Sequence, residues 1–500
     1  MSGECKIITD QLLRDTVSES DVEKLNLKKS SKYSKLKQLL AGLSATLGCF
    51  MNGLVMGYTG PALPSLTNST GDGGLNILNV KMNIDYQQGS WIAGLVSIGC
   101  LVGSLLAGPV MEKYGRRFSL IVCSSGSFCF GFFLMLFASS NVLLYIGRLL
   151  NGVGLGFVMA TSSVYIIEIC SPDMRGLLGC FIQLMWSIGV LVMFILGCFL
   201  NWWQLILAKI VCLVPYVLGM YISPESPRWL FLQGKDEEGR RALRWLRGDI
   251  QENILEEKLI RLELQTRISD EVKIREMIKE PGFLKPFLIA VFIMFFRNMS
   301  GMGVIIAYCN TILKDSGTEF DANLSSITVG IILVLSCLFA TLVLVKFARK
   351  AVLVISMFGM GLSFTVLGFY FQTLEAEKEN SFEGMYGVLN MQYRWVPCTA
   401  ILALLFLGNS GYGTLVWVVI AEILPKKTRS LANSIIIFIA YLIGFISTKS
   451  FIDLTLLLQE SGAFYFYSAV CMLGAVFTIV FVPETRGKSL QEIELQFSKK

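Results

Sequence analysis

The chain has 500 residues, of which 54% are hydrophobic and only 16% are charged, whereas soluble proteins carry about 25% charged residues. It contains no histidine, the commonest metal ligand and general base. These features exclude an ordinary soluble domain, and the net charge of +6 does not indicate nucleic-acid binding.

Twelve apolar segments are long enough to cross a bilayer, because about 20 apolar residues in a helix span a hydrocarbon core about 30 Å thick. They fall at residues 38–60, 89–110, 118–138, 142–166, 177–199, 204–222, 286–313, 323–345, 351–371, 396–420, 430–450 and 463–482. We therefore expect an all-α membrane protein with twelve transmembrane helices.

Lysine and arginine are distributed unequally between the two sides of these segments. The outside segments hold few of the 43 basic residues, namely Lys81, Lys314, Lys378, Arg394 and Lys449. The positive-inside rule therefore predicts that both termini are cytoplasmic. The first 37 residues are polar and basic, so we expect no cleaved signal peptide.

Asn68 begins an Asn-Ser-Thr tripeptide in the first outside segment and is a candidate for N-glycosylation. Most of the 13 cysteines stand alone inside apolar segments, where we expect them to pack as small residues. We expect no metal site and no cofactor.

The longest cytoplasmic segment, 223–285, divides the spans into two groups of six. We expect cytoplasmic tails at 1–37 and 483–500, and two six-helix halves at 38–222 and 286–482. The segment between the halves is charged and has helical periodicity. Two interpretations of it are open: a solvated amphipathic linker, or a segment that takes part in gating.

The two halves repeat each other at three places. "EICSPDMR" after the fourth span sets Glu168 and Arg175 seven residues apart, and "EILPKKTR" after the tenth sets Glu422 and Arg429 at the same spacing. "PESPR" after the sixth span corresponds to "PETRG" after the twelfth, and "KYGRR" after the second corresponds to "KFARK" after the eighth. Such repeats are typical of transporters that bind substrate between two halves near the bilayer midplane.

Several of these stretches resemble signatures of the sugar porter family of the major facilitator superfamily, namely "GPVMEKYGRR" (108–117), "GRLLNGVGLG" (147–156), "PESPRWL" (224–230) and "PETRGKSL" (483–490). "GYTGPALPSL" (57–66) and "QQGSWIAGL" (87–95) resemble the insect facilitated trehalose transporters. The resemblance covers the chain from about residue 40 to 495. It implies a multi-pass, monomeric carrier in the plasma membrane that moves trehalose or a hexose by alternating access.

The resemblance also implies a gating network of charged residues at the cytoplasmic helix ends: Glu112, Arg116, Arg117, Glu168, Arg175, Glu225, Arg228, Glu422, Arg429 and Glu484. In the family such residues stabilise the outward-facing state. Each exposed pair contributes about 0–1 kcal/mol, but a network can bias a two-state equilibrium. Alternatively, these charges only set the topology. Val345 and Ala348 replace the Asp and Gly usual in the family, so we expect a looser network in the second half.

The candidates for substrate binding are Gln183, Arg297, Asn298, Ser300 and Trp417. A sugar needs amide and hydroxyl groups in place of water, and an aromatic face for its C–H surface. Gln183 in "FIQLMWSIG" and Trp417 in "GYGTLVW" match the substrate glutamine and tryptophan of the family. The alternatives are a hydrogen bond between helices for Gln183 and packing for Trp417.

The seventh span departs from the family, whose usual QQLSGINAVIYY is replaced by "RNMSGMGVIIAY" (297–308). A guanidinium at bilayer depth costs at least a few kcal/mol unless it faces a cavity or a partner. Arg297 offers only donors, in a fork suited to carboxylate or phosphate. We expect it to face a central cavity beside a helix break at "SGMG". Pairing with backbone carbonyls or a helix end is the alternative.

The tenth span lacks two prolines of the family, where Thr414 and Val416 stand instead, so we expect a straighter helix there. Leu333 and Ala440 occupy positions where the family commonly has Asn. The site therefore keeps Gln183 and Trp417 but loses several sugar-binding amides.

The first span has no Asp or Glu, and a proton carrier needs a titratable group at depth. We therefore expect facilitated diffusion without proton coupling. Two alternatives remain open: a carrier of small organic anions that uses Arg297, and a membrane sugar sensor that does not transport. The sequence offers no nucleotide loop, catalytic triad or metal cluster, so we do not expect an enzyme.

Overall fold

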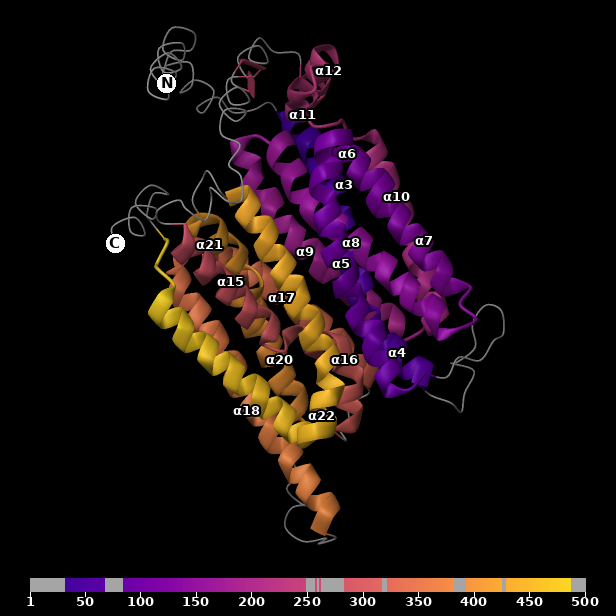
Figure 1. The fold of residues 1–500 in the computed structure, drawn as a ribbon, viewed down its shortest axis with the longest axis vertical. Coiled ribbons are helices and arrows are strands. Elements are labelled where there is room, and N and C mark those ends of the chain that lie inside the picture. The colour runs from indigo at the N-terminus through magenta and orange to yellow at the C-terminus, as the bar shows by residue number, and fades with distance from the viewer. Residues whose placement is uncertain are drawn as a thin grey trace.

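The computed structural model describes residues 32–67, 84–248, 257–258, 260–261, 283–316, 322–380, 393–424 and 429–486. Across these ranges the regular structure is helical, without a strand. The helices form two bundles that lie side by side (Figure 1). Asn68 lies outside the described residues.

The first half contains the helices that correspond to the first six predicted spans. They are α3 (Lys32–Gly57) with its short continuation α4 (Thr59–Thr67), α5 (Tyr86–Tyr114), the π-helical turn η2 (Ser119–Ser124) with α7 (Ser125–Leu136), α8 (Asn141–Ile169), α9 (Pro172–Gly197) and α10 (Trp202–Ile222). The short α6 (Arg116–Phe118) precedes η2. 

The second half contains the helices of the last six predicted spans. They are α15 (Leu284–Met299) with α16 (Met302–Asp315), α17 (Ala322–Lys346), α18 (Arg349–Asn380), α20 (Val396–Gly408) with η3 (Asn409–Gly413) and α21 (Leu415–Ile423), and α22 (Arg429–Phe481). The 53-residue α22 contains two spans, because Gln459 interrupts its helical backbone with φ 63° and ψ 174°. The predicted all-α membrane fold in two halves is confirmed, and nine helical segments of the described residues are long and apolar enough to cross a membrane.

Helices α11 (Pro227–Leu232) and α12 (Asp236–Arg247) project from one end of the bundle (Figure 1). We call this end the charged end, and the opposite end, where α4 lies, the far end. α12 is not wholly solvated, because Leu246 is buried and its carbonyl accepts a hydrogen bond from Ser34 Oγ at 3.0 Å. The linker thus docks onto the first residues of α3.

Each half has its own hydrophobic core. Phe132 and Trp202 are buried in the first core, and Phe364 and Phe464 in the second. The second core also includes Phe194 of α9, so the halves share apolar contact. 

Within the first half, glycines allow helix backbones to approach closely. A Cβ atom on Gly99 of α5 would lie 2.0 Å from the carbonyl oxygen of Leu149, and one on Gly53 of α3 would lie 2.1 Å from that of Trp186. Small residues of this kind are typical of helix contacts in membranes, where lipid removes most of the hydrophobic driving force between helices.

The seventh span breaks at the "SGMG" stretch, as expected. α15 ends at Met299, and Gly301 has a left-handed φ of 76° before α16 begins at Met302. Glycine adopts this conformation without the steric cost that a Cβ atom imposes. The rings of Phe364 and Tyr467 also lie where that Cβ atom would be, at 2.9 Å.

The expectation of a straighter tenth span is wrong. The π-helical turn Asn409–Gly413 and the irregular residue Thr414 separate α20 from α21 although the prolines are absent. Thr414, which replaces one proline, donates from its Oγ1 to Asn409 O at 2.8 Å. A side-chain hydrogen bond of this kind satisfies a carbonyl inside an irregular turn, so a proline is not needed for the interruption.

Replacing Gly301 with alanine should destabilise the protein, because a left-handed conformation costs an alanine about 1–2 kcal/mol and two rings must also move. Gly303→Ala is the matched control, since nothing lies within 4 Å of its Cβ position. Thermal unfolding of the purified variants in detergent would check this. Equal unfolding midpoints for the two variants would contradict the explanation.

Candidate functional site

A cavity of about 170 Å³ lies between the two halves. The first half lines it from α3, α5, α8 and α9, and the second half from α15, α16, α18, η3, α21 and α22. The sequence-predicted residues that line it are Gln183, Arg297, Asn298, Ser300 and Trp417. The lining within the described residues includes no Asp or Glu.

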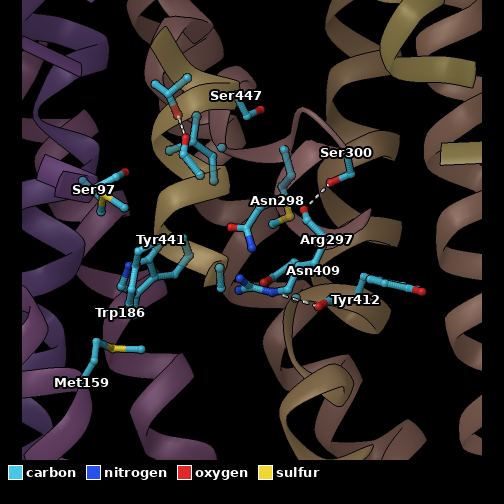
Figure 2. A pocket seen from close by; sticks show the side chains of 18 of the residues that line it. Ser97, Met159, Trp186, Arg297, Asn298, Ser300, Asn409, Tyr412, Tyr441 and Ser447 are labelled. Atoms are coloured by element: carbon cyan, nitrogen blue, oxygen red, sulfur yellow. Dashed lines mark hydrogen bonds between the residues drawn. The ribbon is translucent and has the colours of Figure 1, made fainter. Parts of the chain in front are cut away.

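Arg297 approaches the cavity from the last turn of α15, beside the helix break (Figure 2). Its Nε donates to Tyr412 O at 3.2 Å, and its guanidinium carbon lies 5.3 Å from the centre of the Trp417 ring. A carbonyl and an aromatic face thus hold one edge and one face of the guanidinium. Its two Nη groups form no hydrogen bond with any described residue.

Asn298 and Ser300 differ in what they offer to the cavity. Asn298 Nδ2 donates to Met294 O at 2.9 Å, which leaves its Oδ1 as an acceptor. Ser300 is buried, and its Oγ donates to Arg297 O at 2.7 Å. The serine hydroxyl therefore satisfies the end of α15, as the dashed line in Figure 2 shows.

Gln183 joins the two halves directly at the cavity. Its Nε2 donates to Asn409 Oδ1 at 3.4 Å, which is a long hydrogen bond. Asn409 in turn donates from Nδ2 to Leu333 O at 3.1 Å and to Ser336 Oγ at 2.8 Å. The alternative interpretation of Gln183, a hydrogen bond between helices, is thus present in this conformation.

Sequence reasoning missed Asn409, Asn52, Trp186 and Tyr441, which all line the cavity. Asn52 is buried, and neither its Nδ2 nor its Oδ1 has a partner among the described residues. A buried amide without a partner is costly, so a ligand that bonds to it would recover that cost. Two of these residues could have been found from the sequence, because each is an asparagine inside an apolar span: Asn52 in "CFMNGL" and Asn409 in "FLGNSG".

At the charged end, the first half contains a compact cluster around Glu225. Its carboxylate accepts from the backbone N–H groups of Arg116, Arg117 and Ser226 at 2.8–3.1 Å. Burial raises the pKa of Glu225 above its ordinary value, although these donors oppose the shift. Arg116 also pairs with Glu168 at 2.9 Å. The cluster therefore connects α6, α8 and the segment before α11.

The second half repeats this cluster with corresponding residues. Glu484 accepts from the backbone N–H groups of Arg349 and Lys350 at 3.1 Å, and the Arg349 guanidinium pairs with Glu422. Arg349 and Lys350 occupy the positions of Arg116 and Arg117 in the repeat. Arg349 was not among the predicted gating residues.

The looser second network stays a prediction, because the side chains of Arg175, Val345 and Arg429 lie outside the described structure. Glu112 occupies the acidic position that Val345 takes in the second half, but its carboxylate is exposed and has no ion pair with a described residue. Toward the described residues, only the carbonyl of Glu112 takes part, accepting from Trp229 Nε1 at 2.8 Å. The acid missing at Val345 therefore removes no ion pair seen in the first half.

The described structure shows fewer side-chain contacts for the remaining gating candidates. Arg117 donates from Nε to Met220 O at 3.2 Å. Arg228 lies in α11. Arg175 lies near the beginning of α9 and Arg429 begins α22, and the contacts of these two side chains lie outside the described structure.

At the far end, side chains of the two halves meet. Gln87 Nε2 of α5 donates to Asp453 Oδ1 of α22 at 2.7 Å, and Lys449 Nζ donates to Gln87 Oε1 at 3.2 Å. The rings of Trp91 and Phe445 lie 6.0 Å apart. At the charged end, by contrast, the two clusters described above each lie within one half. The halves are thus joined at the far end in this conformation.

Two six-helix halves around a shared cavity define a secondary transporter. The fold is similar to that of the xylose transporter XylE from E. coli in its inward-open conformation, with a TM-score of 0.71 and 21% identity over 91% of this chain and 98% of that chain. A partially occluded inward-open structure of XylE also gives 0.71, with 22% identity over 92% of this chain and 100% of that chain.

The family model described as "Sugar (and other) transporter" matches residues 41–497. A Drosophila simulans protein named facilitated trehalose transporter Tret1-2 homolog is 34% identical, over 91% of this chain and 90% of its own length. The facilitated trehalose transporter Tret1 of Polypedilum vanderplanki is 33% identical, over 91% and 87%. The chain belongs to the sugar porter family of the major facilitator superfamily, a family of multi-pass membrane transporters and not of enzymes.

Replacing Glu225 with alanine should lower the thermal stability of the protein. It leaves three backbone N–H groups without their acceptor, at a cost of about 1–3 kcal/mol for each group that water does not reach. Glu112→Ala removes an exposed carboxylate from the same end and should change stability by no more than about 0.5 kcal/mol. Unfolding midpoints in detergent test this, and a larger loss for Glu112→Ala would show that the cluster is misassigned.

Proposed function

We propose that this protein is a facilitative carrier that moves a sugar by alternating access, with trehalose or a hexose as the substrate. The observation that carries the proposal is the cavity that both halves line with amide and aromatic side chains. Relatives named as facilitated trehalose transporters support the choice of sugar. The cavity has a volume of about 170 Å³, which is smaller than that of pockets for drug-sized ligands, about 300–1,000 Å³. To bind a disaccharide, the two halves would therefore have to separate further than to bind a single sugar ring.

The proposed sugar contacts combine acceptors, donors and an aromatic face. The free Oδ1 of Asn298 and the Oε1 of Gln183 would accept hydrogen bonds from hydroxyl groups, and the amide of Asn52 offers both a donor and an acceptor. Trp417 would cover the C–H face of a sugar ring. Ser300 is proposed to act through the helix end that it satisfies.

The transport cycle follows from where the halves touch. To open the far end, the hydrogen bond of Gln87 with Asp453 and the ring contact of Trp91 with Phe445 have to separate. The two charge clusters each lie within one half. We propose that the clusters act in gating by holding the helices of each half together while the two halves move relative to each other.

Facilitated diffusion is supported by the lining of the cavity, which has no Asp or Glu among the described residues, since a proton carrier needs a titratable group at depth. The asymmetry of Lys and Arg along the sequence supports cytoplasmic termini. The plasma membrane as location and a monomeric state remain parts of the proposal that rest on the family resemblance.

Purified protein in proteoliposomes should take up labelled trehalose or glucose until the inside and outside concentrations are equal. A protonophore should leave the initial rate unchanged, because the proposed cycle moves no proton. Empty liposomes are the control. Uptake that a protonophore abolishes would refute facilitated diffusion, and binding without uptake would identify a sensor in place of a carrier.

Gln183→Ala should weaken sugar uptake about tenfold, which corresponds to the loss of one good hydrogen bond. The amount of folded protein should remain normal, because the only hydrogen bond of Gln183 to a described residue is the long one to Asn409. Gln372→Ala is the matched control, because it also removes one side-chain hydrogen bond, the one that Tyr465 Oη donates to Gln372 Oε1 at 2.8 Å, at an exposed position of α18 away from the cavity. Equal losses of uptake and of folded protein in Gln183→Ala would favour a structural role.

A further inference from the structure

Arg297 presents an unpaired cationic edge to the cavity. Its Nε is engaged by Tyr412 O and its face by Trp417, so the side chain is fixed in one orientation (Figure 2). Neither Nη group forms a hydrogen bond with a described residue. The two parallel N–H groups of such an edge match the two oxygens of a carboxylate, or two oxygens of a phosphate.

The cavity does not supply an anion of its own. Among the described lining residues there is no Asp or Glu, and the acidic side chains of the charge clusters are engaged at the charged end. An ion at this depth is costly unless water or an opposite charge compensates it. A ligand that carries an anionic group would compensate it, whereas a hydroxyl group would do so only in part.

The neighbouring groups have the opposite polarity. Asn298 and Gln183 already donate from their amide nitrogens, to Met294 O and Asn409 Oδ1, so their oxygens remain as acceptors for hydroxyl groups. Among the described residues that line the cavity, only Arg297 combines a positive charge with two free donors. A ligand that satisfies all of these groups therefore has several hydroxyl groups and one oxyanion.

We infer that the Nη edge of Arg297 is an oxyanion subsite, and that the carrier binds a sugar-sized ligand with an oxyanion more tightly than its neutral analogue. This inference rests on the proposed function, since it concerns the same cavity. The carboxylate of a uronic acid and the phosphate of a sugar phosphate share the chemistry that the subsite recognises.

Binding to the purified full-length protein in detergent, measured by calorimetry, tests the subsite independently of transport. Glucuronate and glucuronamide share one ring and differ only at the terminal group, which is a charged carboxylate in the first and a neutral carboxamide of similar shape in the second. The wild-type protein should bind glucuronate at least about tenfold more tightly, as expected for hydrogen bonds to a charged group. Glucose 6-phosphate against glucose provides the same comparison for phosphate.

Arg297→Gln should reduce both ratios to about one, and Arg297→Lys should leave an intermediate preference, because lysine keeps the charge but loses the fork. Lys285→Gln removes an exposed positive charge from the first turn of the same helix and should keep the wild-type ratios. An Arg297-dependent preference in either pair supports the subsite and shows which oxyanion it takes. Ratios near one in the wild-type protein, or unchanged in Arg297→Gln, would overturn it.

The proposed function is tested separately, by measuring uptake of labelled trehalose and glucose by the wild-type protein. Uptake of these neutral sugars without any preference for the anionic ligands refutes only the subsite. Tight binding of an anionic ligand without uptake of neutral sugar refutes neutral-sugar transport and supports the subsite.

Discussion

Every backbone N–H and C=O within the hydrocarbon has to be hydrogen-bonded inside the protein, so irregular backbone is tolerated only where protein or a cavity surrounds it. Both interrupted spans of the second half obey this constraint. The break at Gly301 and the π-helical turn Asn409–Gly413 border the same cavity, and side chains satisfy their carbonyls. Arg297 bonds to Tyr412 O and Thr414 to Asn409 O, so the irregular backbone both forms the site and positions its charge.

The two halves use one device for holding helix ends together. In each, a glutamate after the last span accepts from successive backbone N–H groups, and an arginine pairs with a second glutamate. Such pairs alone contribute little when exposed, but bonds from backbone N–H groups to a carboxylate are charge-assisted and stronger. The device connects helices within a half, and its described ion pairs and hydrogen bonds do not cross to the other half.

The residues that line the cavity restrict the choice of substrate more than the fold does. The family scaffold fixes a cavity between two halves, and many substrates are compatible with that geometry. The oxyanion subsite that we infer at Arg297 would narrow the choice of substrate, because a cation with free donors binds neutral and anionic ligands with different strength. Gln183 and Asn409 meanwhile join the halves in this conformation, so a ligand that replaces their hydrogen bond would act at the junction on which the cycle depends.

The sequence by itself predicted twelve spans and determined the repeat of the two halves and the family, because apolar length and motif spacing are local properties of the chain. It also marked Gln183, Arg297, Asn298, Ser300 and Trp417, since polar and aromatic residues within apolar spans need a reason to be there. Tertiary structure alone decided which groups of these residues remain free. Ser300 turns to its own helix, the Glu112 carboxylate stays outside the cluster, and Thr414 takes over the role expected of a proline. Such outcomes depend on which carbonyl or amide a neighbouring helix brings within about 3 Å, and linear spacing does not encode that distance.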